Sequence, residues 1–298
     1  MSPGGGASIR RTVDGREITI SRPGKVLFPA TGFTKGQLID YYAAVAGVML
    51  PHLAERPLTM KRFPDGVDGD WFFEKHAPAH APAWVRQAAV PSAGGTVDYV
   101  VVDDPSTLVW AADLATIEFH VPLWRVSPDG TVPGPPDHMV FDLDPGEGST
   151  IVECCRVATR IADIMAARGE ESVPKTSGRK GLHVYSPLSG QPTWSTVRQQ
   201  SREIAVELEK TSPELVVSNM RRSLRPGRVL VDWSQNAPAK STVAAYSLRA
   251  CSEPTVSTPV TWEEVERCGQ VGDPSVLRFS PTQVLDRIER LGDLFAAV

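Results

Sequence analysis

An aspartate pair lies in the middle of the chain, at the end of the apolar segment from His138 to Gly146. With the two-residue period of a β-strand, Asp142 and Asp144 project from one side and the residue between them from the other. Pro145 and Gly146 then end the strand. Carboxylates this close repel each other and raise a pKa unless a positive group lies between them. Because Mg²⁺ prefers carboxylate oxygens and substrate phosphates, the pair predicts a metal-assisted site, with a solvent-facing edge strand as the alternative.

Two later stretches carry residue types that would complete such a site. SGRKGLHV, residues 177–184, is a basic turn bracketed by glycines that runs into a strand. Gly178 and Gly181 let backbone N–H groups approach a phosphate, and Lys180 adds a point charge. The spacing is not that of an ATP-binding P-loop, and a solvated basic turn is the alternative. A second apolar strand, residues 228–233, carries a third carboxylate, Asp232, near its end.

Taken in order, the motifs DLDPG (residues 142–146), SGRKGLHV and VLVDWSQN (residues 229–236) resemble the three motifs of the archaeo-eukaryotic primase superfamily. The resemblance is strongest to the polymerase domain of bacterial ligase D, an end-joining repair enzyme, and to its stand-alone primase-polymerase relatives. It covers the chain from about Pro23 to Arg249. It implies an α/β fold (α+β, with mixed sheets), in which a primase-like catalytic core with a sheet like that of RNA-recognition motifs packs on an N-terminal α/β part.

The activity that the resemblance implies is template-dependent polymerisation that fills short gaps or broken ends in DNA repair, with ribonucleotides favoured. Asp142, Asp144 and Asp232 match the catalytic aspartates, which hold two Mn²⁺ or Mg²⁺ ions. The residues that match positions binding the incoming NTP or dNTP are His120, Ser177, Arg179, Lys180, His183 and Arg249, with Gln235 as a looser match and Arg225 as another. Metal ligands and positive charge are what phosphoryl transfer requires of a protein.

The basic N-terminal part resembles the DNA-binding surface of the same enzymes. The matching residues are Lys25, Lys35, Phe72 and Phe73, and Lys61 and Arg62 are expected to extend the same basic surface. Lys25 and Lys35 match lysines that hold the 5′-phosphate of the downstream strand, and the two phenylalanines match aromatics that stack on a template base. Because adjacent strand residues face opposite ways, one phenylalanine should stack while the other packs inward. Two core phenylalanines are the alternative.

The charge distribution bears on nucleic-acid binding more than the net charge of −4 does. Residues 1–62 carry a net charge of +5 and residues 175–249 one of +7, so the remainder is strongly acidic. Two basic regions on an acidic chain indicate a localised anion-binding surface, with chance clustering as the alternative. The partners that the resemblance implies are DNA with gaps or double-strand breaks and a recessed 5′-phosphate, nucleoside triphosphates, a ligase and an end-binding protein.

The sequence shows no targeting feature. No apolar run approaches the length of about 18 residues that a membrane span needs, and the N-terminus lacks the apolar core of a signal peptide. The four cysteines, Cys154, Cys155, Cys251 and Cys268, fit neither a zinc motif nor a disulfide framework. We therefore expect a reduced, cytoplasmic protein, and the resemblance implies association with the bacterial nucleoid.

A disordered leader is expected at residues 1–8, followed by a single domain over residues 9–298. Residues 9–136 would form the DNA-binding and 5′-phosphate-binding part, and residues 137–298 the catalytic part with a C-terminal helix. Whether the chain stands alone or belongs to a larger protein is left open by the sequence.

Capping and breaker residues predict several element boundaries. A helix over residues 35–49 should begin after Thr34 and end at Pro51. Another should begin at Thr150, with Glu153 completing a capping box, and end at Gly169. A strand is expected at residues 242–249, and the last helix at residues 282–296.

Two other functions compete with the polymerase hypothesis. Haloacid-dehalogenase-type phosphohydrolases also use D-x-D after an apolar strand, but they want Thr or Val two residues after the second aspartate, where this chain has Gly146. Their motif also usually opens the chain. A DNA-end-binding module without catalysis is disfavoured because Asp142, Asp144 and Asp232 are all present.

Overall fold

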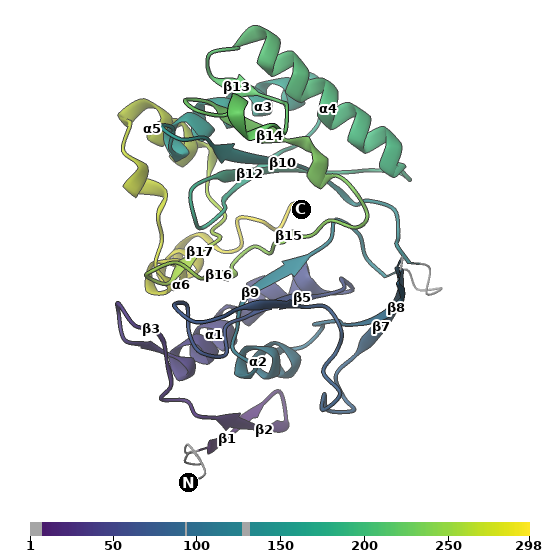
Figure 1. Ribbon diagram of the computed structural model, residues 1–298, viewed down its shortest axis with the longest axis vertical. Helices are drawn as coiled ribbons and strands as arrows, with labels where there is room; N and C mark the ends of the chain where they lie inside the picture. The colour runs from purple at the N-terminus through teal and green to yellow at the C-terminus, as the bar shows by residue number, and fades with distance from the viewer. Residues whose placement is uncertain (1–7, 93, 127–131) are drawn as a thin grey trace.

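A computed structural model of the chain describes residues 8–92, 94–126 and 132–298. Two sheets face each other across the middle of the molecule, and helices cover their outer faces (Figure 1). One cluster of buried apolar residues runs through both layers, from Ile18 to Phe295. Among the described residues, no helix combines the length and apolar character needed to cross a membrane. The mixed α/β fold class predicted from the sequence is confirmed.

The N-terminal sheet is antiparallel, with the strand order β15-β9-β5-β6. Its strands are β5 (Thr59–Arg62), β6 (Phe72–Glu74), β9 (Thr116–Val121) and β15 (Thr242–Val243). Helices α1 (Lys35–Leu53) and α2 (Pro105–Asp113) lie beneath it (Figure 1). Thr34 caps α1 as predicted, but the helix passes through Pro51, which was expected to end it. A proline this close to the end of a helix removes only one hydrogen bond, so the last turn persists.

The catalytic sheet has the strand order β11-β12-β10-β14-β13. Its strands are β10 (His138–Pro145), β11 (Val173–Thr176), β12 (Leu182–Pro187), β13 (Val216–Val217) and β14 (Val229–Asp232), and only the β13–β14 pair is parallel. Helices α3 (Ile151–Ala167) and α4 (Trp194–Thr211) cover its outer face (Figure 1). The predicted capping box of Thr150 and Glu153 begins α3, which ends at a cap on Arg168, one residue before the predicted Gly169.

Shorter elements complete the fold of the described residues. Hairpins join β1 (Ser8–Val13) to β2 (Arg16–Ser21), β3 (Val26–Phe28) to β4 (Phe33–Thr34), β7 (Gln87–Ser92) to β8 (Gly95–Val100), and β16 (Leu248–Arg249) to β17 (Thr255–Val256). The remaining helices are α5 (Trp262–Val271), α6 (Pro281–Leu291) and the 3-10 turns η1 (Arg222–Leu224), η2 (Trp233–Gln235) and η3 (Pro274–Leu277).

Two sequence predictions of local structure need correction, and a third falls mostly outside the described residues. The strand expected at residues 242–249 is two short strands, β15 and β16, because Tyr246 between them adopts a positive φ of 65°. The last helix ends at Leu291 rather than 296, since Gly292 adopts a positive φ of 68°. The leader expected over residues 1–8 lies outside the described residues except for Ser8, which begins β1.

Candidate active site

The three predicted aspartates meet where β10 and β14 lie side by side. Asp142 pairs directly with Asp232 across these strands. Directly opposed residues have Cβ atoms roughly 4.5–5.5 Å apart and point to the same face. Asp144 projects from that face two residues further along β10. The sheet register therefore brings together the carboxylates that the sequence places 90 residues apart.

The aspartates of β10 differ in their electrostatics. Burial opposes ionisation of Asp142, but the hydrogen-bonded ring of His183, with Lys175 and Arg249 further away, outweighs burial and lowers the pKa of Asp142. Burial and the neighbouring charges of Asp142 and Asp232 raise the pKa of Asp144 to about 7. The clustered negative charge is therefore only partly balanced by protein groups, as the sequence predicted for this motif.

The donor set of the site fits a hard divalent cation. Within residues 8–92, 94–126 and 132–298, no three acidic, imidazole or thiol side chains converge into a ready-made metal cage. Asp232 instead accepts hydrogen bonds from the Ser234 N–H and hydroxyl, at 2.9 and 2.5 Å, and from Gln235 Nε2, at 3.0 Å. Mg²⁺ commonly binds one or two carboxylates together with water and substrate phosphates rather than an all-protein cage. Three carboxylates with an unbalanced charge suit this mode.

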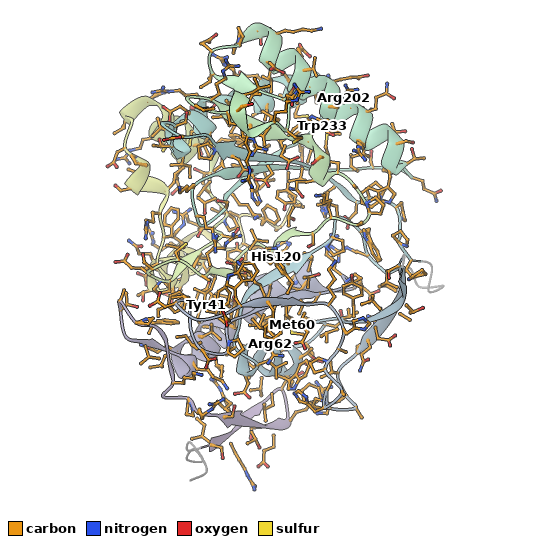
Figure 2. The ribbon with its side chains drawn as sticks, viewed as in Figure 1. Tyr41, Met60, Arg62, His120, Arg202 and Trp233 are labelled. Atoms are coloured by element: carbon orange, nitrogen blue, oxygen red, sulfur yellow. The ribbon has the colours of Figure 1, made fainter. Side chains whose placement is uncertain are left out.

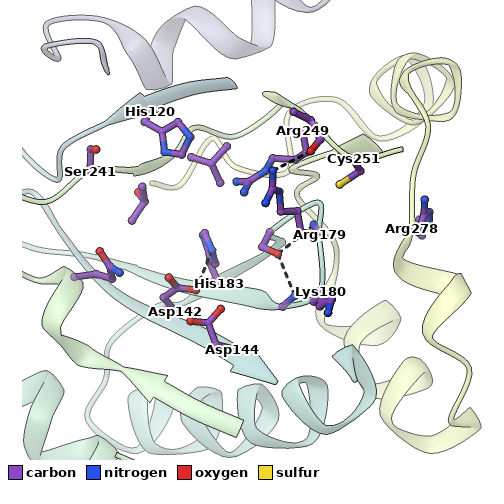
Figure 3. Close-up of a pocket in the computed structure, with 16 residues that line it drawn as sticks. His120, Asp142, Asp144, Arg179, Lys180, His183, Ser241, Arg249, Cys251 and Arg278 are labelled. Carbon is purple, nitrogen blue, oxygen red and sulfur yellow. Dashed lines mark hydrogen bonds and ion pairs between the residues drawn. The ribbon is translucent and has the colours of Figure 1, made fainter. Parts of the chain in front are cut away.

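A cavity of about 590 Å³ opens over the carboxylates (Figure 3). Its lining includes Asp142 and Asp144 together with all seven predicted nucleotide-binding residues: His120, Ser177, Arg179, Lys180, His183, Gln235 and Arg249. These come from both sheets and from the β16 segment. Two carboxylates therefore line one wall of the cavity, and several cationic side chains line the opposite wall (Figure 3).

The Ser177 side chain stabilises the turn from Ser177 to Gly181 through hydrogen bonds to the backbone. Ser177 Oγ accepts the N–H groups of Arg179 and Gly181, at 3.3 and 3.0 Å. A methyl group on Gly181 would lie 2.2 Å from the Leu143 carbonyl oxygen, and one on Gly178 would lie 2.7 Å from the backbone of Val256. The glycines therefore allow close packing, and the Gly181 N–H, expected to face a phosphate, donates to Ser177 instead.

His183 contacts a carboxylate as well as lining the cavity. Its Nε2 lies 3.1 Å from Asp142 Oδ1, an ion pair drawn in Figure 3. The sequence interpretation assigned His183 to nucleotide binding and did not anticipate this contact. His183 and Asp142 are direct cross-strand partners in β12 and β10, so the contact follows from the sheet register.

A buried carboxylate that the sequence interpretation missed, Glu118, lies behind the cationic wall. Glu118 is 0% exposed. Its oxygens accept from His120 Nε2 at 3.0 Å, Arg179 Nη2 at 3.1 Å and the Ala250 N–H at 3.2 Å. Lys61 and Arg249 add longer ion pairs of 3.5 and 3.6 Å. The alternating strand places Glu118 and His120 on one face, and this Glu-x-His pattern was the one available sequence signal.

Burial and neighbouring charges shift the pKa values of Glu118 and His120. Burial opposes ionisation of Glu118, but the hydrogen bond from His120 and the charges of Arg249 and Lys61 hold the pKa of Glu118 well below its ordinary value. Burial lowers the pKa of His120 despite its bond to Glu118. His120 is therefore a neutral hydrogen-bonding group at pH 7, and Figure 2 shows it between the two sheets.

Two of the predicted 5′-phosphate lysines lie close together but are not equally accessible. Lys25 is partly exposed and forms an ion pair of 2.7 Å with Asp65. Lys35 is 4% exposed and bonds Asp113 and Ser21, at 2.7 and 2.8 Å. The Lys35 N–H also donates to the Lys25 carbonyl oxygen. Lys25 is thus the one whose ammonium group a ligand can reach directly.

The other predicted cations also have protein partners. Lys61 is buried, facing Glu118, with its ammonium 4.2 Å from the centre of the Trp71 ring. Arg62 bonds Glu74 and the Leu114 carbonyl oxygen. The sequence interpretation expected both residues to extend the exposed basic surface, but neither does so. Lys61 instead lies behind the cavity wall, paired with Glu118.

The predicted template-stacking aromatics are both exposed. Phe72 is 43% and Phe73 51% exposed, so the expectation that one of them packs inward is wrong. They lie on β6, the edge strand of the sheet, and the described chain buries neither face of it. Phe73 lies 5.5 Å from Trp71 and 5.7 Å from His120, measured between ring centres. An exposed aromatic surface therefore adjoins the nucleotide-sized cavity.

Arg225, one of the looser sequence matches, lies beside the catalytic strand. Its guanidinium donates to the Met220 carbonyl oxygen at 2.7 Å, and its charge acts to lower the pKa of Asp144. A methyl group on Gly146 would lie 1.9 Å from the Arg225 carbonyl oxygen. Gly146 therefore allows the Arg225 loop to approach the end of β10.

Clustered carboxylates facing a cationic, nucleotide-sized cavity define a phosphoryl- or nucleotidyl-transfer enzyme. The family described as LigD, primase-polymerase domain, matches residues 34–295. The chain therefore belongs to the family of LigD primase-polymerase domains, and the predicted class of nucleotidyltransferase is confirmed. The dehalogenase alternative is thereby set aside.

Curated relatives and a solved structure support the same family assignment. The chain is 43% identical to the multifunctional non-homologous end joining protein LigD of Mycolicibacterium smegmatis, over 94% of this chain and 36% of that protein. It is 45% identical to the multifunctional non-homologous end joining DNA repair protein LigD of Mycobacterium tuberculosis H37Rv, with the same coverage. The chain thus spans about a third of the length of these curated relatives. The solved polymerase domain from Mycobacterium tuberculosis ligase D, in complex with DNA, matches with a TM-score of 0.87 and 45% identity, over 93% of this chain and 96% of that one.

Proposed function

We propose that this chain adds nucleotides to a primer 3′-hydroxyl under the direction of a template, and fills short gaps or broken ends in DNA repair. The observation that carries the proposal is the cavity that places Asp142 and Asp144 opposite the cationic wall held by Glu118. A nucleoside triphosphate needs positive charge around its phosphates and metal ligands beside its reacting phosphorus. Both are present within this one cavity.

The chain's own residues bind and orient the triphosphate. Arg179, Lys180 and Arg249 supply the positive charge, and Glu118 fixes the directions of two of them. His120, neutral at pH 7, offers a hydrogen bond without adding charge. Because Glu118 also bonds the N–H of Ala250, the β16 segment that carries Arg249 is tied to the same anchor.

The metal ligands in this proposal are Asp142, Asp144 and Asp232, holding two Mn²⁺ or Mg²⁺ ions. Bound there, the ions would lower the pKa of the primer hydroxyl and neutralise charge on the leaving pyrophosphate. Asp144 has a pKa of about 7 in the metal-free protein. Binding of a cation at neutral pH should therefore release part of a proton from this carboxyl.

DNA is the proposed macromolecular substrate, and a solved relative holds DNA. Lys25 would give up its ion pair with Asp65 to contact the 5′-phosphate of the downstream strand. Lys35, which is buried, would add positive charge without contacting the phosphate directly. Phe72 and Phe73 would stack on a template base, and both are accessible for it. Such a substrate implies action at the bacterial nucleoid, in the cytoplasm, together with a ligase and an end-binding protein.

Ribonucleotides are the proposed favoured substrates. A polar partner for the 2′-hydroxyl and the lack of a bulky excluding side chain are the physical requirements. Ser177 is the proposed partner. Because its Oγ already accepts two backbone N–H groups, it has its hydroxyl hydrogen left to donate.

Extension on gapped DNA tests the proposal. A primer-template with a short gap, Mn²⁺ and single nucleotides should give extension that obeys the template base, with ribonucleotides incorporated at least as fast as deoxynucleotides. A 5′-phosphate at the gap should increase affinity about tenfold over a 5′-hydroxyl, from charge-assisted contacts of roughly 1.5–3 kcal/mol each. Lack of template-directed extension would refute the polymerase function, and equal affinity for both gaps would refute the gap-filling role.

A further inference from the structure

Lys175 is a buried cation that the proposed chemistry does not use. Its side chain, from β11, is 0% exposed, which is unusual for lysine. The ammonium nitrogen has three partners: the Val243 carbonyl oxygen at 3.0 Å, Ser257 Oγ at 2.7 Å and His183 Nδ1 at 3.1 Å. Burial lowers the pKa of Lys175 well below its ordinary value, and the three directed contacts offset part of the cost of burying its ammonium form.

Four polar side chains form a row across the catalytic sheet. In register, Lys175 of β11 pairs with His183 of β12, His183 pairs with Asp142 of β10, and Asp142 pairs with Asp232 of β14. Directly opposed residues share one face of the sheet. The row therefore runs without interruption from the buried ammonium to the carboxylates of the proposed metal site.

The direction of each hydrogen bond in this row can be assigned. The Val243 carbonyl oxygen only accepts, and Ser257 Oγ donates its hydrogen to the Thr176 carbonyl oxygen at 2.9 Å, so it accepts from Lys175. The third N–H of the ammonium is then left for His183 Nδ1. With Nδ1 as acceptor, the ring carries its hydrogen on Nε2 and donates it to Asp142 Oδ1.

We propose that Lys175 is a positioning residue for the metal-binding carboxylates, which holds His183 in the Nε2–H tautomer and through it fixes the orientation of Asp142. A carboxylate with one oxygen bonded to a fixed ring keeps its remaining lone pairs in one direction. Groups that orient metal ligands in this way typically change metal affinity by tenfold to a hundredfold.

Direct binding of Mn²⁺, without DNA or nucleotide, tests the effect on the site. Lys175→Met keeps most of the length of the side chain and removes its donors. The variant should bind Mn²⁺ about tenfold to a hundredfold more weakly by calorimetry than the unaltered protein. Lys210→Met, at an exposed position on α4, removes the same charge elsewhere and should leave the affinity unchanged. Unchanged affinity in a folded Lys175→Met variant would overturn the proposal.

The tautomer of His183 provides a readout that a purely structural lysine would not move. Long-range ¹⁵N–¹H spectra of the histidine-labelled protein, with the His183 signals identified by a His183→Asn variant, should show a single Nε2–H tautomer. Lys175→Met should give a mixture. If that variant does not fold, the unaltered protein still decides, because an Nδ1–H tautomer or a mixture there would overturn the proposal. Since the role rests on the proposed metal-assisted chemistry, lack of Mn²⁺ binding by the unaltered protein would refute that chemistry instead.

Discussion

Replacing Asp144 by asparagine should stabilise the metal-free protein at pH 8, although it removes a carboxylate from the centre of the site. Burial and the charges of Asp142 and Asp232 raise the pKa of Asp144 from 3.8 to about 7. A shift of that size corresponds to about 4 kcal/mol at 1.36 kcal/mol per pH unit. Protein atoms crowd the Asp144 carboxyl enough to desolvate it, but the residue is still exposed at the mouth of the site, so screening by solvent should reduce the gain to roughly 1–2 kcal/mol.

The pH dependence of this gain has a definite sign. In the unfolded chain Asp144 loses its proton near its ordinary pKa of 3.8, while in the folded protein it keeps it up to about pH 7. The folded state thus binds more protons across this window and loses stability as the pH rises through it. The advantage of Asp144→Asn should be largest at pH 8 and should shrink as the pH is lowered toward 4.

Asp142→Asn is the matched control, since it removes the same charge two residues away. The pKa of Asp142 is lowered, because His183 and the nearby cations outweigh burial. Ionised Asp142 therefore stabilises the fold above its ordinary pKa, and this variant should be destabilised at pH 8. Urea unfolding in EDTA at several pH values measures both changes. Equal destabilisation by the two variants, or a gain for Asp144→Asn that does not depend on pH, would refute the electrostatic description of the site.

Three further predictions concern the surroundings of the site. Glu118→Gln should weaken nucleotide binding at least about tenfold in a direct titration, since an amide cannot hold the cations that Glu118 orients; unchanged affinity would contradict its role. Lys25→Ala should abolish the preference for a 5′-phosphate, whereas Lys35→Ala should also lower the free energy of unfolding by about 1–3 kcal/mol, because Asp113 loses its partner; a fully stable Lys35→Ala would argue against this pair. Gly146→Ala should cost roughly 1–3 kcal/mol in urea unfolding, because its methyl group would lie 1.9 Å from the Arg225 carbonyl oxygen; an unchanged midpoint would show that the loop yields.

Local features of the catalytic part could be predicted from the sequence because they depend on near neighbours. The period-two segment at Asp142 and Asp144, and the capping residue Thr150, gave β10 and the start of α3 close to their observed bounds. The pairing of Asp142 with Asp232 could not be derived from spacing, since register is set by tertiary packing. Only the resemblance of three ordered motifs placed these aspartates in one site.

Burial and partners account for most of what the sequence did not reveal. Glu118 was missed because nothing local shows that a strand glutamate is buried beneath several cations. Lys35 was expected to hold a 5′-phosphate, yet its place at the start of α1 directs it onto Asp113. One of Phe72 and Phe73 was expected to pack inward, because the sequence does not show that β6 is an uncovered edge strand. Each of these depends on which other element lies opposite.

The central claim is that Asp142, Asp144 and Asp232 together support template-directed nucleotidyl transfer. Primer extension with Mn²⁺ by the unaltered protein and by the three single alanine variants tests it most directly, with DNA binding measured in parallel. The unaltered protein should add the nucleotide that the template specifies. Each variant should bind DNA almost as well but lose extension, because several kcal/mol of transition-state stabilisation depend on the metal ligands. A variant that keeps more than about a tenth of the rate would contradict the role of its aspartate.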